Sequence, residues 1–464
     1  MILKQQQFKF VLLIFLAVVI ATVITRLIPP VQSPDENVHL MRADMISHGQ
    51  WLLLPGTSDK GREGGLVDSN LIVFIESMMG ISGNGASKEN TPDLLSNLGQ
   101  KKWAHQQTFA NAAGTGYYLP IIYTPHALGL FFSRKLDLTM QASYEITRTF
   151  VVATSLIIMA WAFSLYTPNI LSIMLLTTPM ALFQFNSPTI DGICTAIAIA
   201  VIGLWLQVSN SDRYKNNSEL SWQEVCLYGL ILVLCTARTN LLPTLIIPLM
   251  LAASKPTRQR ITVVACMYFL TAGWIVFGIS TTYDSRVVRD YTTLKILTNY
   301  FSSPSEFFDL LKRTLSDFEI RRFYRHSFLG ILGWLDTPIS RQAVRVLSAA
   351  IVIATAVLVV FTPWRREWPK RTVFLLIGIA STLLIFFALA ISWNNYPSEK
   401  IWGVQGRYFL IPMLFLAASI GRLEAGGRIS RSTEFFALAA FLIYSLYILT
   451  TTLAAQYRMG SLYF

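Results

Sequence analysis

The sequence is poor in cysteine, histidine and charge, and several classes of function therefore find no support in it. It has four cysteines and five histidines among 464 residues, and 14% of its residues are charged. The cysteines form no CxxC pair and the histidines show neither HxxxH nor HExxH spacing, so the sequence predicts no disulfide framework, zinc site or metal ligands. We expect no required cofactor, although a divalent cation stays open.

Apolar residues take up most of the chain instead. Hydrophobic residues make up 53% of the sequence and the mean hydropathy is +0.48, which is typical of integral membrane proteins. The net charge of +12 comes from short basic clusters between apolar runs, not from a continuous basic surface interleaved with aromatic residues. We therefore expect the lipid bilayer, and not nucleic acid, as the partner of the chain.

Eleven apolar runs are candidates for transmembrane helices. They lie at residues 10–24, 145–165, 170–186, 190–207, 223–238, 240–253, 261–279, 344–362, 372–391, 405–421 and 435–454. A single helix over 223–253 would be about 45 Å long, more than the hydrocarbon core needs, so we expect two helices with a turn at residues 239–240. No small-residue cleavage site follows the first run, which is therefore interpreted as an uncleaved span. The predicted fold is an all-α integral membrane protein with about eleven transmembrane helices.

The loop charges indicate the orientation of these helices. Cytoplasmic loops carry an excess of Lys and Arg, and with the amino terminus inside every short basic cluster becomes cytoplasmic. These clusters lie at residues 4–9, 213–215, 255–260, 365–371 and 422–431. A single helix over 223–253 would place the last three clusters outside.

Five regions follow from this topology. They are a first transmembrane helix in 1–28, an extracytoplasmic loop with interfacial helices in 29–144, helices two to seven in 145–279, a second large extracytoplasmic loop in 280–343, and helices eight to eleven in 344–464. Amphipathic pieces of the first loop lie at residues 37–50, 69–79 and 117–132, and Ser303 is a helix start in the second. Both loops are on the outer side.

Ionisable residues near membrane depth often mark a site, and here they fall at one boundary. On the predicted topology the outer ends of the spans carry Asp35, Glu36, Arg148, Asp191, Arg238 and Arg407. The alternative interpretation is interfacial snorkelling and pairing of Arg with Asp at helix ends.

The most informative segment follows the first span and runs from Ser33 to Ala43. Pro34 is expected at the first turn of a helix, which puts Asp35 and Glu36 where the helix dipole favours negative charge. Asp35 and His39 are then neighbours four residues apart on one face, close enough to share a proton. The alternative is a well-capped interfacial helix without catalytic chemistry.

Several motifs together resemble a known enzyme superfamily. The Asp35-Glu36 pair after the first span, the large first outer loop, the YLPIIYTP run from Tyr118 and the QGRY run from Gln405 are similar to membrane glycosyltransferases of the GT-C type. Judged by PDENVHLMRA, SPTIDG, LGWLDT and QGRY together, the chain is most similar to a bacterial family of multi-span membrane proteins of unassigned function. The resemblance extends over about residues 30–420.

The resemblance implies transfer of a sugar from a polyprenyl-phosphate donor to a glycan acceptor on the extracytoplasmic face of a bacterial inner membrane. Asp35 matches the position of the catalytic base, with Glu36 and His39 beside it. The donor phosphate is expected at Arg148, Arg238 and Arg407, because a lipid phosphate lies at headgroup depth. The other expected substrate-binding residues are Arg42, Asp191, Trp334, Asp336, Gln405 and Tyr408.

Other functions stay open at this point. The nearest alternatives are a polymerase or ligase that uses lipid-linked oligosaccharide, and a transporter of lipid-linked sugar. An acyltransferase based on His39 and Asp35 and a non-enzymatic assembly factor are further alternatives. The sequence indicates neither broken helices or charges at mid-depth of a span nor repeats between its halves, which disfavours transport.

Overall fold

The computed structural model describes residues 16–56, 61–82, 91–211, 219–284, 287, 289–362, 364–365, 367–420 and 431–457. Helices make up 74% of the structure. Within these residues six helices are long and apolar enough to cross a membrane: α7 (Met140–Leu165), α10 (Ile190–Asn210), α14 (Arg258–Thr281), α18 (Arg341–Phe361), α19 (Trp368–Ser392) and α21 (Arg431–Tyr457). This confirms an integral membrane protein built from apolar helices, while the number of eleven spans stays a prediction.

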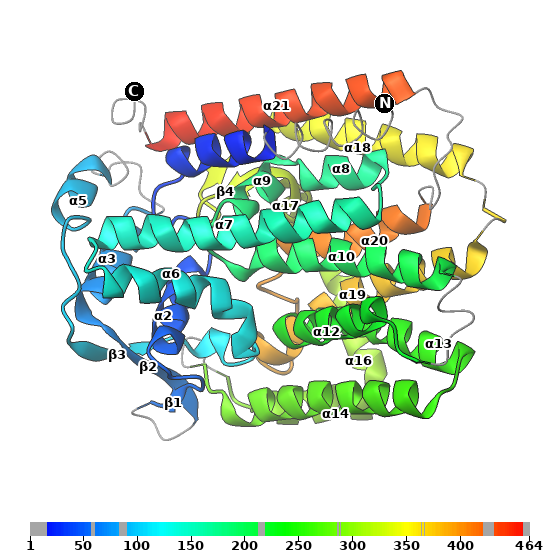
Figure 1. The fold of residues 1–464 in the computed structure, drawn as a ribbon, viewed down its shortest axis with the longest axis horizontal. Helices are drawn as coiled ribbons and strands as arrows, with labels where there is room; N and C mark the ends of the chain where they lie inside the picture. Colours follow the sequence, from blue (N-terminus) through cyan, green and yellow to red (C-terminus); the bar gives the residue numbers. More distant parts are fainter. Residues whose placement is uncertain are drawn as a thin grey trace.

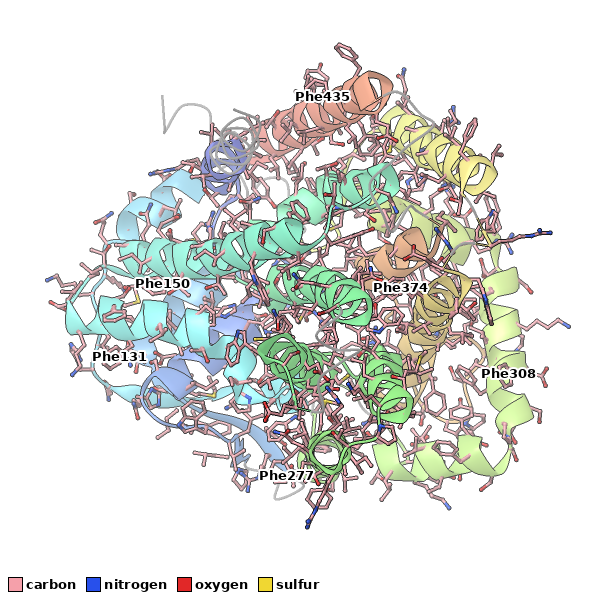
Figure 2. The ribbon with its side chains drawn as sticks, turned by 45° about the vertical axis from the view of Figure 1, so that its right-hand side comes forward. Phe131, Phe150, Phe277, Phe308, Phe374 and Phe435 are labelled. Atoms are coloured by element: carbon pink, nitrogen blue, oxygen red, sulfur yellow. The ribbon has the colours of Figure 1, made fainter. Side chains whose placement is uncertain are left out.

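The long helices lie roughly along one axis, and the strands and short helices of the first polar region gather at one end of them. Figure 1 shows α7, α10, α14 and α21 roughly parallel, with β1–β3, α2, α3 and α6 together at the left. Inside the bundle the ring of Phe374 packs at 4.8 Å, edge to face, against Trp205. Figure 2 shows Phe374 within the bundle, whereas Phe308 and Phe435 lie on its outside, exposed by 58% and 67%. Basic residues predicted to be cytoplasmic at 4–9, 213–215, 366 and 422–430 lie outside the described residues.

The predicted span at 170–186 is broken into two short helices, α8 (Ile170–Leu176) and α9 (Pro179–Phe185). Thr178 caps α9 by accepting a hydrogen bond from the Ala181 amide, and Pro179 occupies the first helical position. Proline has no amide hydrogen to continue the preceding helix, which is why the chain breaks here. The break brings α9 against the start of α10, where Thr189 is the N-cap.

The chain reverses next to the predicted turn at residues 239–240. Helix α12 (Trp222–Ala237) ends at Arg238, and η3 (Thr239–Leu245) and α13 (Ile246–Ser254) follow. The thiol of Cys235 lies 3.2 Å from the Thr244 hydroxyl across this turn. Arg238 is therefore held at the end of a helix, next to a tight connection.

The first polar region holds a small antiparallel sheet that the all-α prediction missed. Its strands are ordered β1 (Leu54–Pro55), β2 (Arg62–Asp68), β3 (Gln107–Asn111), with Gly64 opposite Asn111. A Cβ on Gly64 would lie 1.9 Å from the Ala110 carbonyl oxygen, so the two strands approach closely only because glycine stands there. A seven-residue strand that contains two glycines gives little alternating signal in the sequence.

The same region holds several helices. They are α2 (Glu36–Ser47), α3 (Ser69–Met79), α5 (Thr91–Asn97), the short η1 (Ala113–Thr115) and η2 (Pro120–Tyr123), and α6 (Thr124–Lys135). Of these, α2, α3 and η1 contact the sheet, and the piece predicted at 117–132 is divided between η2 and α6. The amphipathic piece predicted at 69–79 is confirmed in full by α3. The Asp68 carboxylate caps it, 3.0 Å from the Asn70 amide, and also accepts from the amide of His105 at 2.9 Å.

The second polar region contains α15 (Thr293–Ser302), α16 (Pro304–Ser316) and α17 (Phe318–Gly330), followed by a hairpin of β4 (Ile331–Leu332) and β5 (Thr337–Pro338). The helix start predicted at Ser303 is confirmed by α16. Helix α17 packs directly on η4 (Gly406–Phe409), which leads into α20 (Leu410–Ile420). A Cβ on Gly406 would lie 2.0 Å from the backbone nitrogen of Phe328, so glycine allows the contact that fixes η4.

Candidate functional site

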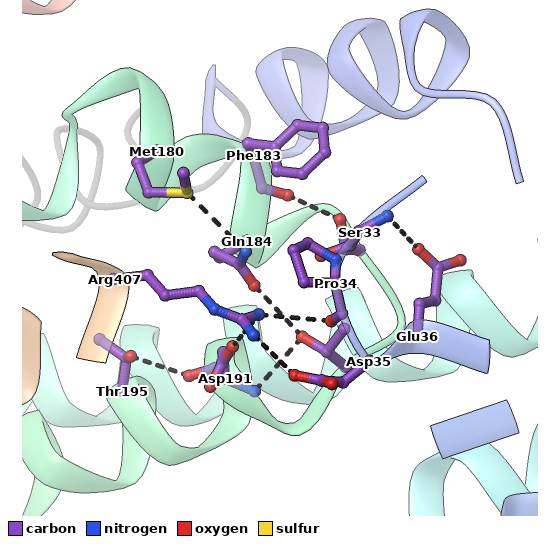
Figure 3. A network of polar contacts seen from close by, with 12 residues as sticks. Ser33, Pro34, Asp35, Glu36, Met180, Phe183, Gln184, Asp191, Thr195 and Arg407 are labelled. Carbon is purple, nitrogen blue, oxygen red and sulfur yellow. Dashed lines mark hydrogen bonds and ion pairs between the residues drawn. The ribbon is translucent and has the colours of Figure 1, made fainter. Parts of the chain in front are cut away.

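Four charged side chains from four distant segments meet at one end of the bundle. Arg407 Nη2 lies 2.6 Å from Asp35 Oδ2, and Arg407 Nη1 lies 3.3 Å from Asp191 Oδ2. Arg238 forms an ion pair with the other oxygen of Asp191. Figure 3 shows the side chains of Asp35, Asp191 and Arg407 converging. We call Asp35, Asp191, Arg238 and Arg407 the charged cluster.

Each member is held by a different element. Asp191 is in the first turn of α10, where the amino end of a helix favours negative charge. Arg238 is the C-cap residue of α12, directly after Ala237, and Arg407 lies in η4, which packs against α17. The side chain of Arg407 is 4% exposed and that of Asp35 is 44% exposed, so the cluster reaches from the interior to an accessible carboxylate.

The turn that presents Asp35 is shaped by its neighbour Glu36. The buried Glu36 carboxylate accepts hydrogen bonds from the amides of Val31 and Ser33, both at 2.9 Å, and from the Tyr144 hydroxyl at 2.6 Å. Val31 and Asp35 both have left-handed backbones, with φ of 61° and 66°. For a β-branched residue such as Val31 this conformation is strained, so other contacts must hold it.

This geometry corrects the expected start of the helix. Helix α2 begins at Glu36 and Asp35 is its N-cap residue, so neither Pro34 nor Asp35 lies in the first turn. The left-handed conformation of Asp35 is the reason. As a result, the Asp35 carboxylate points to Arg407, whose Nη1 also lies 3.3 Å from the Pro34 carbonyl oxygen.

His39 is buried beneath this turn. Its Nδ1 is 2.7 Å from the hydroxyl of Tyr123, and the rings of the two residues lie 5.6 Å apart. Burial lowers the pKa of His39 to about 3, against a smaller raising effect of the Asp35 charge. Burial also raises the pKa of Glu36, although the Tyr144 hydrogen bond and the Arg148 charge oppose it. The hydrogen-bond partner seen for the His39 ring is thus Tyr123 and not the expected Asp35.

Arg148 lies apart from the charged cluster. Its side chain is 1% exposed, and Nη1 donates to the carbonyl oxygens of Thr25 and Ile28, the latter at 3.0 Å. Its guanidinium stacks over the ring of Tyr144 at 4.5 Å. These contacts tie α7 to the end of the first helix, Leu16–Leu27, and Arg148 is not among the residues that line the cavity described below.

Three other predicted residues form hydrogen bonds with neighbouring segments or within their own hairpin. The indole of Trp334 donates to the Val31 carbonyl oxygen at 2.9 Å, and Asp336 accepts from the Thr337 hydroxyl at 3.0 Å in the same hairpin. The buried Arg42 donates to the carbonyl oxygen of Trp51 at 2.5 Å. Trp334 in particular helps to hold Val31 in its strained conformation, at the start of the turn that presents Asp35.

A cavity of about 460 Å³ opens beside the charged cluster. Asp191, Arg238 and Arg407 line one part of it, together with Tyr118 and Tyr408. The guanidinium of Arg238 lies 5.8 Å from the Tyr118 ring centre, and that of Arg407 lies 5.1 Å from the ring of Tyr408. The remaining wall is mainly apolar and includes Leu297, Phe301, Leu384, Ile385 and Phe387.

Sequence reasoning found part of this lining. Asp191, Arg238, Arg407 and Tyr408 were predicted, and Gln405, whose carbonyl oxygen accepts from the Tyr408 amide at 3.1 Å, adjoins them. Tyr118 was seen only as part of a motif, and Gln184, which lies in the apolar run predicted at 170–186, was missed. In the part of the chain that the structure describes, no group of three His, Cys, Asp or Glu residues could hold a metal ion.

Fold and site together define a helical, multi-pass membrane protein with a charged cluster beside a largely apolar cavity. Residues 13–417 match the family model described as predicted membrane protein (DUF2142), and the chain belongs to this family. The searches of curated proteins and of solved structures found no match.

Proposed function

We propose that this protein is a glycosyltransferase that moves a sugar from a polyprenyl-phosphate donor to a glycan acceptor on the extracytoplasmic face of a bacterial inner membrane. One observation carries the proposal: two guanidinium groups and the Asp191 carboxylate line a cavity whose remaining wall is mainly apolar, and the Asp35 carboxylate is paired with one of these guanidinium groups. A donor with one charged headgroup and a long hydrocarbon chain matches this arrangement, because its phosphate would face the guanidinium groups and its chain the apolar wall. The GT-C resemblance of the motifs supports the same activity.

In this proposal Arg238 and Arg407 bind the donor phosphate. Both line the cavity, and both form ion pairs with the Asp191 carboxylate. Guanidinium groups bind the oxygens of a phosphate in the same way as those of a carboxylate. We leave Arg148 out, because backbone carbonyl oxygens already bind its guanidinium. Asp191 then orients the two arginines when no donor is bound.

Asp35 acts as the general base. It is the accessible carboxylate of the cluster, and its ion pair with Arg407 brings it next to the proposed phosphate site. In the proposed reaction the acceptor hydroxyl gives its proton to Asp35 while its oxygen forms a bond to the anomeric carbon. The bond from that carbon to the phosphate oxygen breaks, and the electron pair leaves with polyprenyl phosphate, stabilised by Arg238 and Arg407. A single displacement of this kind inverts the anomeric centre.

Asp35→Asn tests the proposal, because it keeps the shape of the side chain and removes the base. A strain without the protein should lack one glycan component, found by mass and linkage analysis of its surface glycans. The unchanged chain should restore that component, whereas Asp35→Asn should reduce transfer by about 10²-fold or more.

The matched control is Asp309→Asn, which makes the same replacement on an exposed position of α16. We expect it to restore the glycan fully. Full restoration by Asp35→Asn at equal protein level would contradict the proposed mechanism. Loss of polymer length, with every sugar and linkage still present, would favour the polymerase or ligase instead.

A further inference from the structure

Gln184 is an amide in an unusual position. It lies near the end of α9, is 4% exposed, and lines the cavity beside the charged cluster. The other residues of α9 are apolar, from Pro179 to Phe185. Figure 3 shows its amide between Met180 and the group formed by Arg407, Asp35 and Asp191.

The hydrogen-bonding capacity of Gln184 is poorly used. A side-chain amide offers two donors and an acceptor with two lone pairs. The contact of Nε2 is to the Met180 sulfur at 3.8 Å, and that of Oε1 is to the Thr189 hydroxyl at 3.5 Å. Sulfur is a weak acceptor, and 3.5 Å lies beyond the usual range of an oxygen hydrogen bond.

Two other polar side chains of the cavity wall bond to nearby backbone carbonyl oxygens. The Thr195 hydroxyl donates to the Asp191 carbonyl oxygen at 2.8 Å, and the Thr178 hydroxyl donates to the Leu175 carbonyl oxygen at 3.1 Å. Buried polar groups in folded proteins normally have such partners, and one that lacks good partners calls for an explanation. Gln184 differs from these two threonines because the contacts of its polar atoms are long.

We propose that Gln184 binds a hydroxyl group of the donor sugar. This inference rests on the proposed function. An uncharged amide complements a hydroxyl, which both donates and accepts, and it neither attracts nor compensates a charged group. The phosphate beside Arg238 and Arg407 would leave the sugar near the amide of Gln184. The substrate class is therefore a neutral hydroxyl-bearing sugar, recognised on the α9 side of the cavity.

Binding of lipid carriers to the full chain in lipid nanodiscs tests this. The probes are decaprenyl monophosphate alone and the same carrier linked to glucose, galactose or mannose, with dissociation constants measured by tryptophan fluorescence. The unchanged chain should bind at least one sugar-linked carrier about ten-fold more tightly than the bare carrier, the worth of one neutral hydrogen bond. Gln184→Met should abolish this preference and leave the affinity for the bare carrier unchanged.

Gln207→Met is the matched control, because Gln207 is exposed near the far end of α10. It should keep the preference. Gln184→Met should also keep or raise the melting temperature, since it removes a poorly bonded buried amide, whereas a purely structural Gln184 would require a fall. The inference is overturned if the sugar preference survives in Gln184→Met, whether or not the melting temperature falls. It is also overturned if the unchanged chain binds the bare carrier and shows no preference for any sugar-linked carrier. An unchanged chain that binds none of the four probes overturns the proposed function itself.

Discussion

At the scale of single residues, Arg407 connects the parts of the site. Its two terminal nitrogens reach different carboxylates, those of Asp35 and Asp191, and one of them also approaches the Pro34 carbonyl oxygen. The planar, forked guanidinium holds its N–H donors in fixed directions, which lets it serve these separate acceptors at once. Burial of the Arg407 guanidinium is tolerable here because two carboxylates compensate it, and loss of one partner would leave its charge less compensated.

Arg407→Lys is predicted to weaken binding of the donor phosphate. Lysine keeps the positive charge but cannot hold two phosphate oxygens at once, so the dissociation constant for decaprenyl monophosphate should rise roughly ten-fold. Arg345→Lys, an exposed position on α18, is the control and should leave the affinity unchanged. Equal affinity in Arg407→Lys and the unchanged chain would remove Arg407 from the phosphate site.

At the scale of elements, the sequence predicted helices better than the turns between them. The helix at 69–79 and the helix start at Ser303 depend on local patterns, and the structure confirms both. The turn from Val31 to Glu36 depends on Tyr144, which is 108 residues from Glu36 in the sequence. A local pattern cannot reveal such a contact, and so the left-handed Asp35 was not foreseen.

Glu36→Gln is predicted to destabilise this turn. The Glu36 carboxylate accepts from two amides and a hydroxyl, and an amide group in its place would bring one of its N–H donors against another donor. Loss of a buried hydrogen-bond partner costs about 1–3 kcal/mol, so the melting temperature of the purified protein should fall. Glu76→Gln on the exposed side of α3 provides the comparison and should have little effect. An unchanged melting temperature in Glu36→Gln would show that the carboxylate does not hold the turn.

At the scale of the whole molecule, composition and charge predicted the class of protein but not the cavity. Apolar runs identified the membrane class, and the family match agrees with it. The contact between Arg407 and Asp35 joins residues 372 positions apart. The sequence could place both at one boundary of the membrane, but which side chains touch is decided by the packing of α10, α12 and η4, which no local periodicity encodes.

The orientation in the membrane is the prediction at this scale. If residues 223–253 form two segments with a turn between them, α16 is outside and the basic segment at 365–371 is inside. Single cysteines should be introduced by Ser316→Cys and Arg365→Cys into a chain whose four native cysteines are replaced. A membrane-impermeant maleimide should then label Ser316→Cys in intact cells, and label Arg365→Cys only after the inner membrane is permeabilised. The turn after α12 decides the outcome, because a single span over 223–253 would reverse the side of every later segment. Labelling of Arg365→Cys in intact cells, with Ser316→Cys protected, would therefore refute both the two-segment topology and the outward position of the α15–α17 region.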